Sequence, residues 1–348
     1  MFPLINTGIK IFSTGLGFFN PYELNFAITY KCNSRCKTCN IWKIKSENEL
    51  TLKEIEKLAE NIKFIYWIRL TGGEPFLRND YVEIVKILDK NLNLYLLTTP
   101  TNSLSPDLIY ENIKNVLKFF RKRYIISVSL DGTQKIHENI KGIKGSWVKV
   151  IETYKRLKEF EKRYKNFKIF FGYTISPFNV GFFKDTLNEV KKIIPEITIN
   201  DFHINLFQTS DIYYHTKDLK TDNNYYKDAQ KEIDMILKLR KKSLNPISLI
   251  EDKYLILGKK YLETKKTPMK CNIFNLSCFI DPYGNVYPCT IFNKKLGNLR
   301  ENDYNLKNIL TSKTAKRIKK EIIKNKCPGC WTPCEAHQMI MSNWCSLL

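Results

Sequence analysis

The residues of this chain best suited to chemistry are its ten cysteines, which fall into two groups. Three lie at positions 32, 36 and 39 with the spacing C-x3-C-x2-C, and seven lie between 271 and 345. Clustered thiols in a long chain indicate metal ligands rather than the distributed bridges of a small secreted domain. Three thiolates on one short loop can hold three irons of a four-iron, four-sulfur (4Fe-4S) cluster and leave the fourth iron open. Structural zinc is the alternative, but it takes four ligands, and none of the four histidines lies nearby in the sequence.

A second group of polar residues follows an apolar run at 64–70. There the sequence reads Thr-Gly-Gly-Glu-Pro at positions 71–75. Two glycines allow a backbone to come close to a ligand, and the carboxylate of Glu74 can accept hydrogen bonds from an ammonium group. A Gly-Gly-Glu triplet is common in proteins, so its meaning depends on where the fold places it relative to the three cysteines.

Hydrophobic periodicity predicts the elements that must position these residues. Residues 22–31 alternate and are rich in β-formers, so a strand runs directly into Cys32. The period becomes helical from Thr51, which forms a capping-box pair with Glu54. Strands are predicted at 22–31, 64–70, 93–98, 124–130, 168–175 and 198–207, with helices near 51–62, 81–90, 107–121, 147–163 and 184–193. This alternation predicts an α/β fold with a parallel sheet, flat or curled into a partial (β/α)6 barrel, whose ligand site lies at the carboxyl ends of the strands.

The three cysteines after the first strand and the Gly-Gly-Glu after the second resemble the radical S-adenosylmethionine (SAM) enzymes over residues 22–208. In that family SAM chelates the open iron of the cluster, and reduction cleaves SAM to a 5′-deoxyadenosyl radical. The resemblance implies that Cys32, Cys36 and Cys39 bind this cluster. It also implies SAM contacts from Gly72, Gly73 and Glu74 at the methionyl group, Ser129 at the carboxylate or ribose, and Lys141 in place of a family arginine. An ordinary surface lysine is the alternative for Lys141, because lysine lacks the bidentate fork of arginine.

The C-terminal cysteines resemble the SPASM and twitch modules, which follow many radical SAM cores and carry auxiliary iron–sulfur clusters. Four thiolates from a hairpin and a C-x2-C turn would complete one auxiliary 4Fe-4S cluster. The ligands that we predict are Cys271, Cys289, Cys327 and Cys330, with Cys334 able to replace one of the last pair. Zinc is the alternative metal for this module. Cys278 is either a ligand or a buried apolar residue, and the late Cys345 is left without a role.

The 348 residues divide into four predicted segments. These are an apolar extension at 1–21, a radical SAM core at 22–208, a helical bridge at 209–265 and a small SPASM/twitch-like domain at 266–348. A content of 43% hydrophobic and 13% aromatic residues excludes a disordered chain. No apolar run approaches the roughly eighteen residues of a membrane-spanning helix, and the start of the chain lacks a secretory signal, so we expect a cytoplasmic protein. The apolar extension either packs over the barrel or makes a peripheral membrane contact.

The formal charge of +22, from 57 Lys and Arg against 35 Asp and Glu, favours anionic partners. The excess lysines are spread over almost every segment, however, and therefore indicate a compositional bias rather than a nucleic-acid-binding face. A non-enzymatic zinc or iron–sulfur protein that binds nucleic acid is the alternative class.

The resemblance implies a radical SAM enzyme with at least two clusters, which modifies a peptide or a small molecule after hydrogen abstraction. A flavodoxin or ferredoxin is the expected electron donor. A lipid or cofactor precursor at a membrane surface is the alternative substrate. About 21 residues precede the first predicted strand, which leaves no room there for the peptide-recognition domain of several relatives. The sequence predicts no catalytic side chain and no final reaction.

Overall fold

The computed structural model describes residues 21–219, 221–240 and 246–343. The apolar extension, apart from its last residue, and Cys345 lie outside these ranges. The predictions of a membrane contact and of a packing role for the extension are therefore not addressed by the structure.

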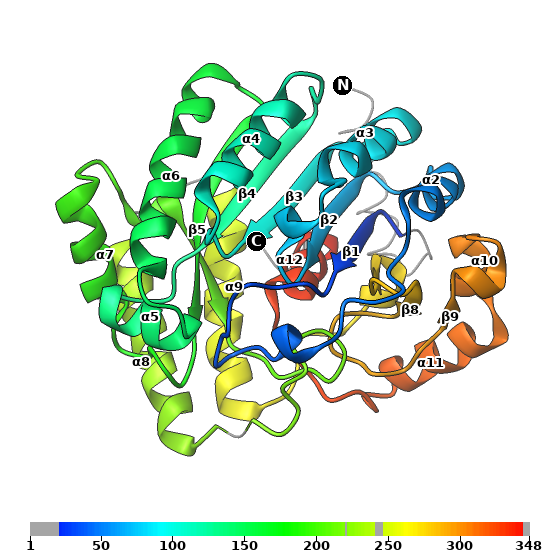
Figure 1. The fold of residues 1–348 in the computed structure, drawn as a ribbon. Coiled ribbons are helices and arrows are strands. Elements are labelled where there is room, and N and C mark those ends of the chain that lie inside the picture. The colour runs from blue at the N-terminus through cyan, green and yellow to red at the C-terminus, as the bar shows by residue number, and fades with distance from the viewer. Residues whose placement is uncertain (1–20, 220, 241–245, 344–348) are drawn as a thin grey trace.

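A six-stranded parallel sheet forms the core (Figure 1). Its strands are β1 (Glu23–Thr29), β2 (Trp67–Gly72), β3 (Leu96–Thr101), β4 (Arg123–Ser129), β5 (Phe167–Ile175) and β6 (Phe202–Leu206), which lie side by side in chain order. The connecting helices are α2 (Leu52–Asn61), α3 (Tyr81–Asn91), α4 (Pro106–Leu117), α5 (Gln134–Lys141), α6 (Ser146–Arg163) and α7 (Phe183–Ile193). The sheet is an unclosed, partial barrel, which confirms the predicted fold class. The short polar helix α5 was not predicted.

The two faces of the sheet differ in composition as the alternating pattern requires. In β4 the side chains of Tyr124, Ile126 and Val128 are fully buried in the main hydrophobic core. The intervening Ser127 and Ser129 are only partly buried and lie on the other face. The helices therefore cover the apolar face, and polar side chains are left for the inner face of the barrel.

The C-terminal part of the chain continues the same sheet. Strand β7 (Ser277–Ile280) pairs in parallel with β1, from Glu23 opposite Ser277 to Phe26 opposite Ile280. Strands β8 (Asn285–Tyr287) and β9 (Gly297–Asn298) follow in antiparallel orientation and complete a nine-stranded sheet. The later helices are α8 (Asn223–Leu239), α9 (Pro246–Thr264), α10 (Leu306–Thr311), α11 (Lys313–Ile323) and α12 (Pro333–Ser342). The division of the chain at 208 and 265 stays a prediction, and the sheet itself crosses from the core into the cysteine-rich part.

Local sequence signals explain how α2 is fixed after the cysteine loop. The Thr51 hydroxyl accepts from the Glu54 amide, and the Glu54 carboxylate accepts from the Thr51 amide at 2.8 Å, so the predicted capping box is present. Within the described ranges no helix has both the length and the apolar character needed to span a membrane.

Candidate active site

The three N-terminal cysteines lie on the loop that follows β1. The amide of Arg35 donates to the carbonyl of Lys141 and that of Lys37 donates to Ile140, both at 2.9 Å. These two bonds hold the loop against the C-terminal end of α5. The loop is therefore fixed by an element that lies more than a hundred residues further along the chain.

Burial disfavours ionisation of two of these thiols, Cys32 and Cys39. The pKa of Cys32 is raised to about 11 and that of Cys39 to about 12, mainly by burial, and the nearby Cys36 thiol contributes to both increases. The three sulfurs thus lie within electrostatic range of one another. Binding of iron would have to displace protons from these groups, as metal binding to cysteine generally does.

The two glycines of the second motif pack against the end of β1. The Gly73 amide donates to the Thr29 carbonyl and the Glu74 amide to the Lys31 carbonyl, both at 2.8 Å. A Cβ atom on Gly73 would lie 2.3 Å from the Lys31 oxygen, and one on Gly72, whose φ is +138°, would lie 2.0 Å from the Thr29 oxygen. We expected these glycines to make room for a ligand. The atoms that they approach most closely are those of the backbone leading into Cys32.

The Glu74 carboxylate is buried, with 1% of the residue exposed. It accepts hydrogen bonds from the Thr101 hydroxyl at 3.0 Å and the Asn102 amide at 2.7 Å, which lie at the end of β3. Burial raises the pKa of Glu74 to about 7, and these hydrogen bonds oppose that rise. Glu74 therefore joins the ends of β2 and β3, and its contact with SAM stays a prediction.

Asn102 ends the polar stretch 98–102, which the resemblance to radical SAM enzymes places near SAM, and it contacts the cysteine loop. Its side-chain amide donates to the Cys32 sulfur at 3.7 Å and to the Asn33 side chain at 2.9 Å. The only signal for it was its place in the polar stretch 98–102 after the third strand. That stretch is now seen to connect Glu74 with the first cysteine.

Lys141 is not the surface residue of the alternative interpretation, because only 5% of it is exposed. Its ammonium group forms an ion pair with Asp131 at 2.8 Å. Burial lowers the pKa of Lys141, but Asp131 and the thiols of Cys36 and Cys32 outweigh burial and raise it above its usual value. A buried cation thus lies within electrostatic range of all three cysteine thiols. Ser129, at the end of β4, is partly buried on the inner face and stays a predicted SAM contact.

Four of the C-terminal cysteines form one electrostatic group. The Cys330 thiol interacts with those of Cys289 and Cys271, and Cys271 also interacts with Cys327. Burial raises the pKa of Cys271 to about 12. The structure brings together the four residues predicted as auxiliary ligands, which come from a hairpin and a C-x2-C turn.

The remaining described cysteines of this region lie in different surroundings. Cys334, at the start of α12, has Arg69, Glu335 and Glu23 as its main electrostatic neighbours. Cys278 is fully buried in the main apolar core. Neither thiol interacts with the four-cysteine group as closely as its members do with one another.

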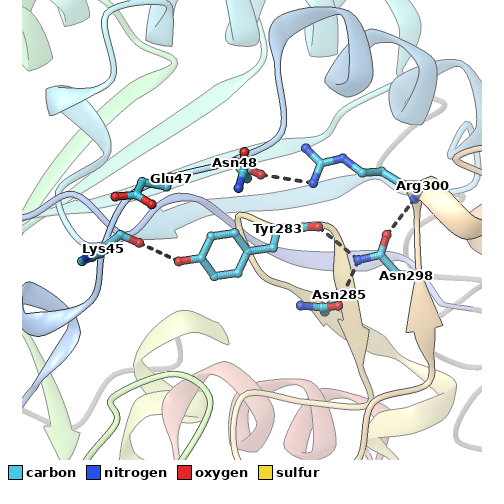
Figure 2. Close-up of a pocket in the computed structure, with 7 residues that line it drawn as sticks. All are labelled: Lys45, Glu47, Asn48, Tyr283, Asn285, Asn298 and Arg300. Carbon is cyan, nitrogen blue, oxygen red and sulfur yellow. Dashed lines mark hydrogen bonds between the residues drawn. The ribbon is translucent and has the colours of Figure 1, made fainter.

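A pocket of about 420 Å³ opens where the segment after Cys39 meets the C-terminal hairpin (Figure 2). The residues that line it are Lys45, Glu47, Asn48, Tyr283, Asn285, Asn298 and Arg300. This pocket contains none of the predicted cluster or SAM residues. It lies where the loop segment 45–48 meets β8, β9 and Arg300, and no cysteine lines it.

The chemistry of the cysteine loop fits a 4Fe-4S cluster, because the loop supplies three thiols. The buried ammonium group of Lys141 lies nearby, and the side-chain amide of Asn102 donates to the Cys32 sulfur. Among the described residues no three His, Cys, Asp or Glu side chains are arranged to hold a single metal ion. In a cluster each thiolate bonds a separate iron. The fold and these thiols together define an iron–sulfur protein with an active site at the carboxyl ends of parallel strands.

Comparison with protein families agrees with this class. Residues 26–194 match the radical SAM superfamily, and residues 271–331 match the SPASM iron–sulfur cluster-binding domain. The chain therefore carries a radical SAM domain followed by a SPASM domain. These matches assign it a 4Fe-4S cluster with SAM and auxiliary iron–sulfur clusters, which confirms the predicted cofactors.

Several curated proteins are similar in sequence. The subtilosin biosynthesis protein AlbA of Bacillus subtilis is 24% identical over 88% of this chain and 65% of its own length. The GTP 3′,8-cyclase of Peptoclostridium acidaminophilum is 33% identical over 38% of this chain and 41% of its own length. A SAM-dependent nucleotide dehydratase of Selenomonas ruminantium is 34% identical over 25% of this chain and 33% of its own length. The chain thus spans less than two thirds of each of these relatives.

Solved structures share the fold. The protein anSMEcpe with bound SAM aligns with a TM-score of 0.59 at 15% identity, over 94% of this chain and 98% of its own. SuiB of Streptococcus suis with SAM aligns with a TM-score of 0.58 at 16% identity, over 86% of this chain and 68% of its own. At these identities the likeness concerns the fold alone.

Proposed function

We propose that this protein is a radical SAM enzyme that modifies a peptide. The observation that supports this most directly is the cysteine loop at the end of β1, bordered by buried Glu74 and Lys141. A 4Fe-4S cluster with SAM supplies, on one-electron reduction, a 5′-deoxyadenosyl radical that abstracts a hydrogen atom. The three-thiol loop suits this chemistry because it leaves one iron without a protein ligand.

The roles proposed for the residues follow from their surroundings. Cys32, Cys36 and Cys39 hold the cluster, and Lys141, fixed by Asp131, offsets its negative charge. Gly72, Gly73, Glu74 and Ser129 are the proposed SAM contacts at the ends of β2 and β4. The auxiliary cluster is proposed to bind to Cys271, Cys289, Cys327 and Cys330.

A peptide is favoured as substrate by the relative that covers most of this chain. AlbA acts in the biosynthesis of a bacteriocin, and structures of anSMEcpe and SuiB hold peptides. The GTP cyclase and the nucleotide dehydratase match 38% and 25% of this chain, so a small-molecule substrate has less support.

A flavodoxin or ferredoxin is the proposed electron donor. Clustered free thiols also favour a reducing compartment, which agrees with a cytoplasmic location.

The test is anaerobic reconstitution of the full chain with iron and sulfide, followed by SAM and a strong reductant. We expect brown protein that forms 5′-deoxyadenosine and methionine, measured by liquid chromatography and mass spectrometry. Colourless protein, or brown protein that leaves SAM intact, would contradict the proposal. Peptides encoded beside the gene can then be screened for a mass change that depends on SAM.

A further inference from the structure

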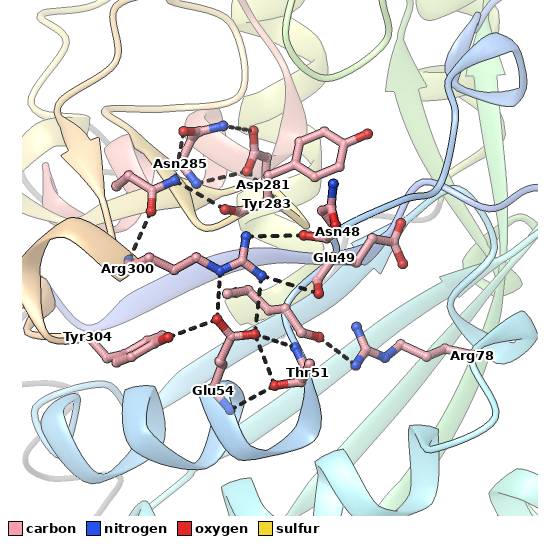
Figure 3. A network of polar contacts seen from close by, with 12 residues as sticks. Asn48, Glu49, Thr51, Glu54, Arg78, Asp281, Tyr283, Asn285, Arg300 and Tyr304 are labelled. Atoms are coloured by element: carbon pink, nitrogen blue, oxygen red, sulfur yellow. Dashed lines mark hydrogen bonds and ion pairs between the residues drawn. The ribbon is translucent and has the colours of Figure 1, made fainter.

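The segment that follows the cysteine loop is held from the C-terminal half of the chain. Arg300 lies in a short 3-10 turn after β9 and donates to the carbonyl of Asn48 at 3.1 Å and that of Glu49 at 3.4 Å (Figure 3). Its guanidinium also forms a two-pronged ion pair with Glu54 at 2.6 and 3.1 Å. One side chain thus binds three residues that lie about 250 positions earlier in the chain.

A second set of contacts comes from the turn between β7 and β8. The Tyr283 hydroxyl donates to the Lys45 carbonyl at 2.7 Å (Figure 2). The Leu50 amide donates to the Pro282 carbonyl at 2.7 Å. We use the name clasp for these contacts of Tyr283, Pro282 and Arg300 with residues 45–54. The clasp holds the part of the segment between Cys39 and α2 that lies next to α2, from Lys45 to Leu50, and the first turn of α2 at Glu54.

The clasped segment in turn holds the backbone that leads into Cys32. The Glu49 carboxylate accepts from the Tyr30 amide at 2.6 Å and from the Thr29 hydroxyl at 3.1 Å. Tyr30 lies two residues before Cys32, and Thr29 is the residue on which Gly72 and Gly73 pack. A chain of direct contacts therefore runs from Arg300 through the backbone of Glu49 to the start of the cysteine loop.

We propose that Arg300 and Tyr283 are positioning residues, through which the C-terminal domain sets the geometry of the cysteine loop and hence the affinity for SAM. The geometry supports this, because two of the four Arg300 side-chain bonds end on the carbonyls of Asn48 and Glu49, and the Glu49 carboxylate in turn holds the backbone that leads into Cys32. Arginine suits this position because its planar fork makes four hydrogen bonds from three nitrogens, two of them to the Glu54 carboxylate, whereas a lysine ammonium has three donors on a single nitrogen. The proposal rests on the proposed function for its SAM readout, but the coupling itself is measurable without SAM.

The experiment compares Arg300→Lys with Arg156→Lys in reconstituted full-length protein. Arg156 is the control, because it too forms ion pairs, with Asp107 at 2.7 Å and Glu152 at 3.1 Å, but does not contact residues 45–54, and its side chain is 30% exposed against 36% for Arg300. The measurements are hydrogen exchange of residues 29–39 by mass spectrometry, iron content, and SAM dissociation constant by calorimetry. We expect Arg300→Lys to speed exchange in 29–39 and to weaken SAM binding about tenfold, as loss of a supporting partner does in metal sites. Arg156→Lys should change neither.

Unchanged exchange and unchanged SAM affinity in Arg300→Lys would overturn the proposal, whatever happens to the melting temperature. If Arg300→Lys loses iron, the milder Tyr283→Phe decides, because it removes one hydrogen bond and keeps the ring. Faster exchange in 29–39 with full iron content supports the clasp, and unchanged exchange contradicts it. If the wild type fails to bind SAM, the proposed function fails, and the exchange comparison still decides on the coupling.

Discussion

At the scale of single residues, the site depends on charged groups that are buried next to the cysteines. Glu74 and Lys141 are 1% and 5% exposed, and each is tied to an element other than its own. Buried charges are stable only when they are paired or hydrogen-bonded. Substitution of either residue should therefore affect stability as well as SAM binding, although the sequence suggested a role toward SAM alone.

Glu74→Gln is the first prediction at this scale. The variant removes a charged acceptor from the Thr101 hydroxyl and the Asn102 amide, so the free energy of unfolding should fall by about 1–3 kcal/mol. SAM binding should also weaken about five- to thirtyfold, the difference between charge-assisted and neutral hydrogen bonds. Thr101→Val is the control, because it removes one hydrogen bond and keeps the carboxylate. Normal SAM affinity in Glu74→Gln would show that the carboxylate has no role toward SAM.

At the scale of elements, we predict that the thiols of the C-terminal hairpin, Cys271 and Cys289, share one cluster with those of the C-x2-C turn, Cys327 and Cys330. Cys330→Ala should lose about four irons, one auxiliary cluster. Cys334→Ala should keep them, because Cys334 at the start of α12 interacts mainly with Arg69 and Glu335. Iron analysis and Mössbauer spectra of the two variants make the comparison. Equal iron loss in both would mean that Cys334 is a ligand.

A buried carboxyl group between α7 and α8 leads us to predict that the stability of the protein depends on pH. Glu232 of α8 is 3% exposed and accepts from the Phe183 amide at 2.8 Å. Burial raises its pKa from 4.5 to about 7, against the effect of this hydrogen bond. The folded protein thus holds the proton more tightly than the unfolded chain, so the free energy of unfolding should fall as pH rises from about 4.5 to about 7.

The variant Glu232→Gln should remove the contribution of Glu232 to this pH dependence, which is on the order of 3 kcal/mol, and leave that of Glu74, whose pKa is also raised to about 7. The measurement is the denaturation midpoint of wild type and variant between pH 5 and 8. Glu159→Gln on the surface of α6, whose partner is Lys162, serves as the control. Parallel pH profiles of wild type and Glu232→Gln would contradict the assignment.

Much of the core could be predicted from periodicity, because each strand carries its own apolar alternation and each helix its own apolar face. The predicted strand at 168–175 is found at Phe167–Ile175, for example. The pairing of β7 with β1 could not be predicted, since no local pattern links strands about 250 residues apart. For the same reason the Asn102 contact with Cys32 and the Arg300 contacts with Asn48 and Glu49 were missed.

At the scale of the whole molecule, one continuous sheet connects the two parts of the chain that bear cysteines. Strand β1 pairs with β2 on one side and β7 on the other, so the loop with Cys32 leaves the sheet between the core and the SPASM domain (Figure 1). The two predicted clusters therefore belong to elements that share hydrogen bonds. Changes in one part have a direct structural route to the other.

The measurement that tests the central claim most directly uses the triple variant Cys32→Ala, Cys36→Ala and Cys39→Ala. After anaerobic reconstitution it should contain about four fewer irons than the wild type and keep its auxiliary cluster. It should form no 5′-deoxyadenosine from SAM, because a cluster with four protein ligands leaves no iron open. Wild-type rates of 5′-deoxyadenosine formation in the triple variant would contradict the assignment of radical SAM chemistry to this loop.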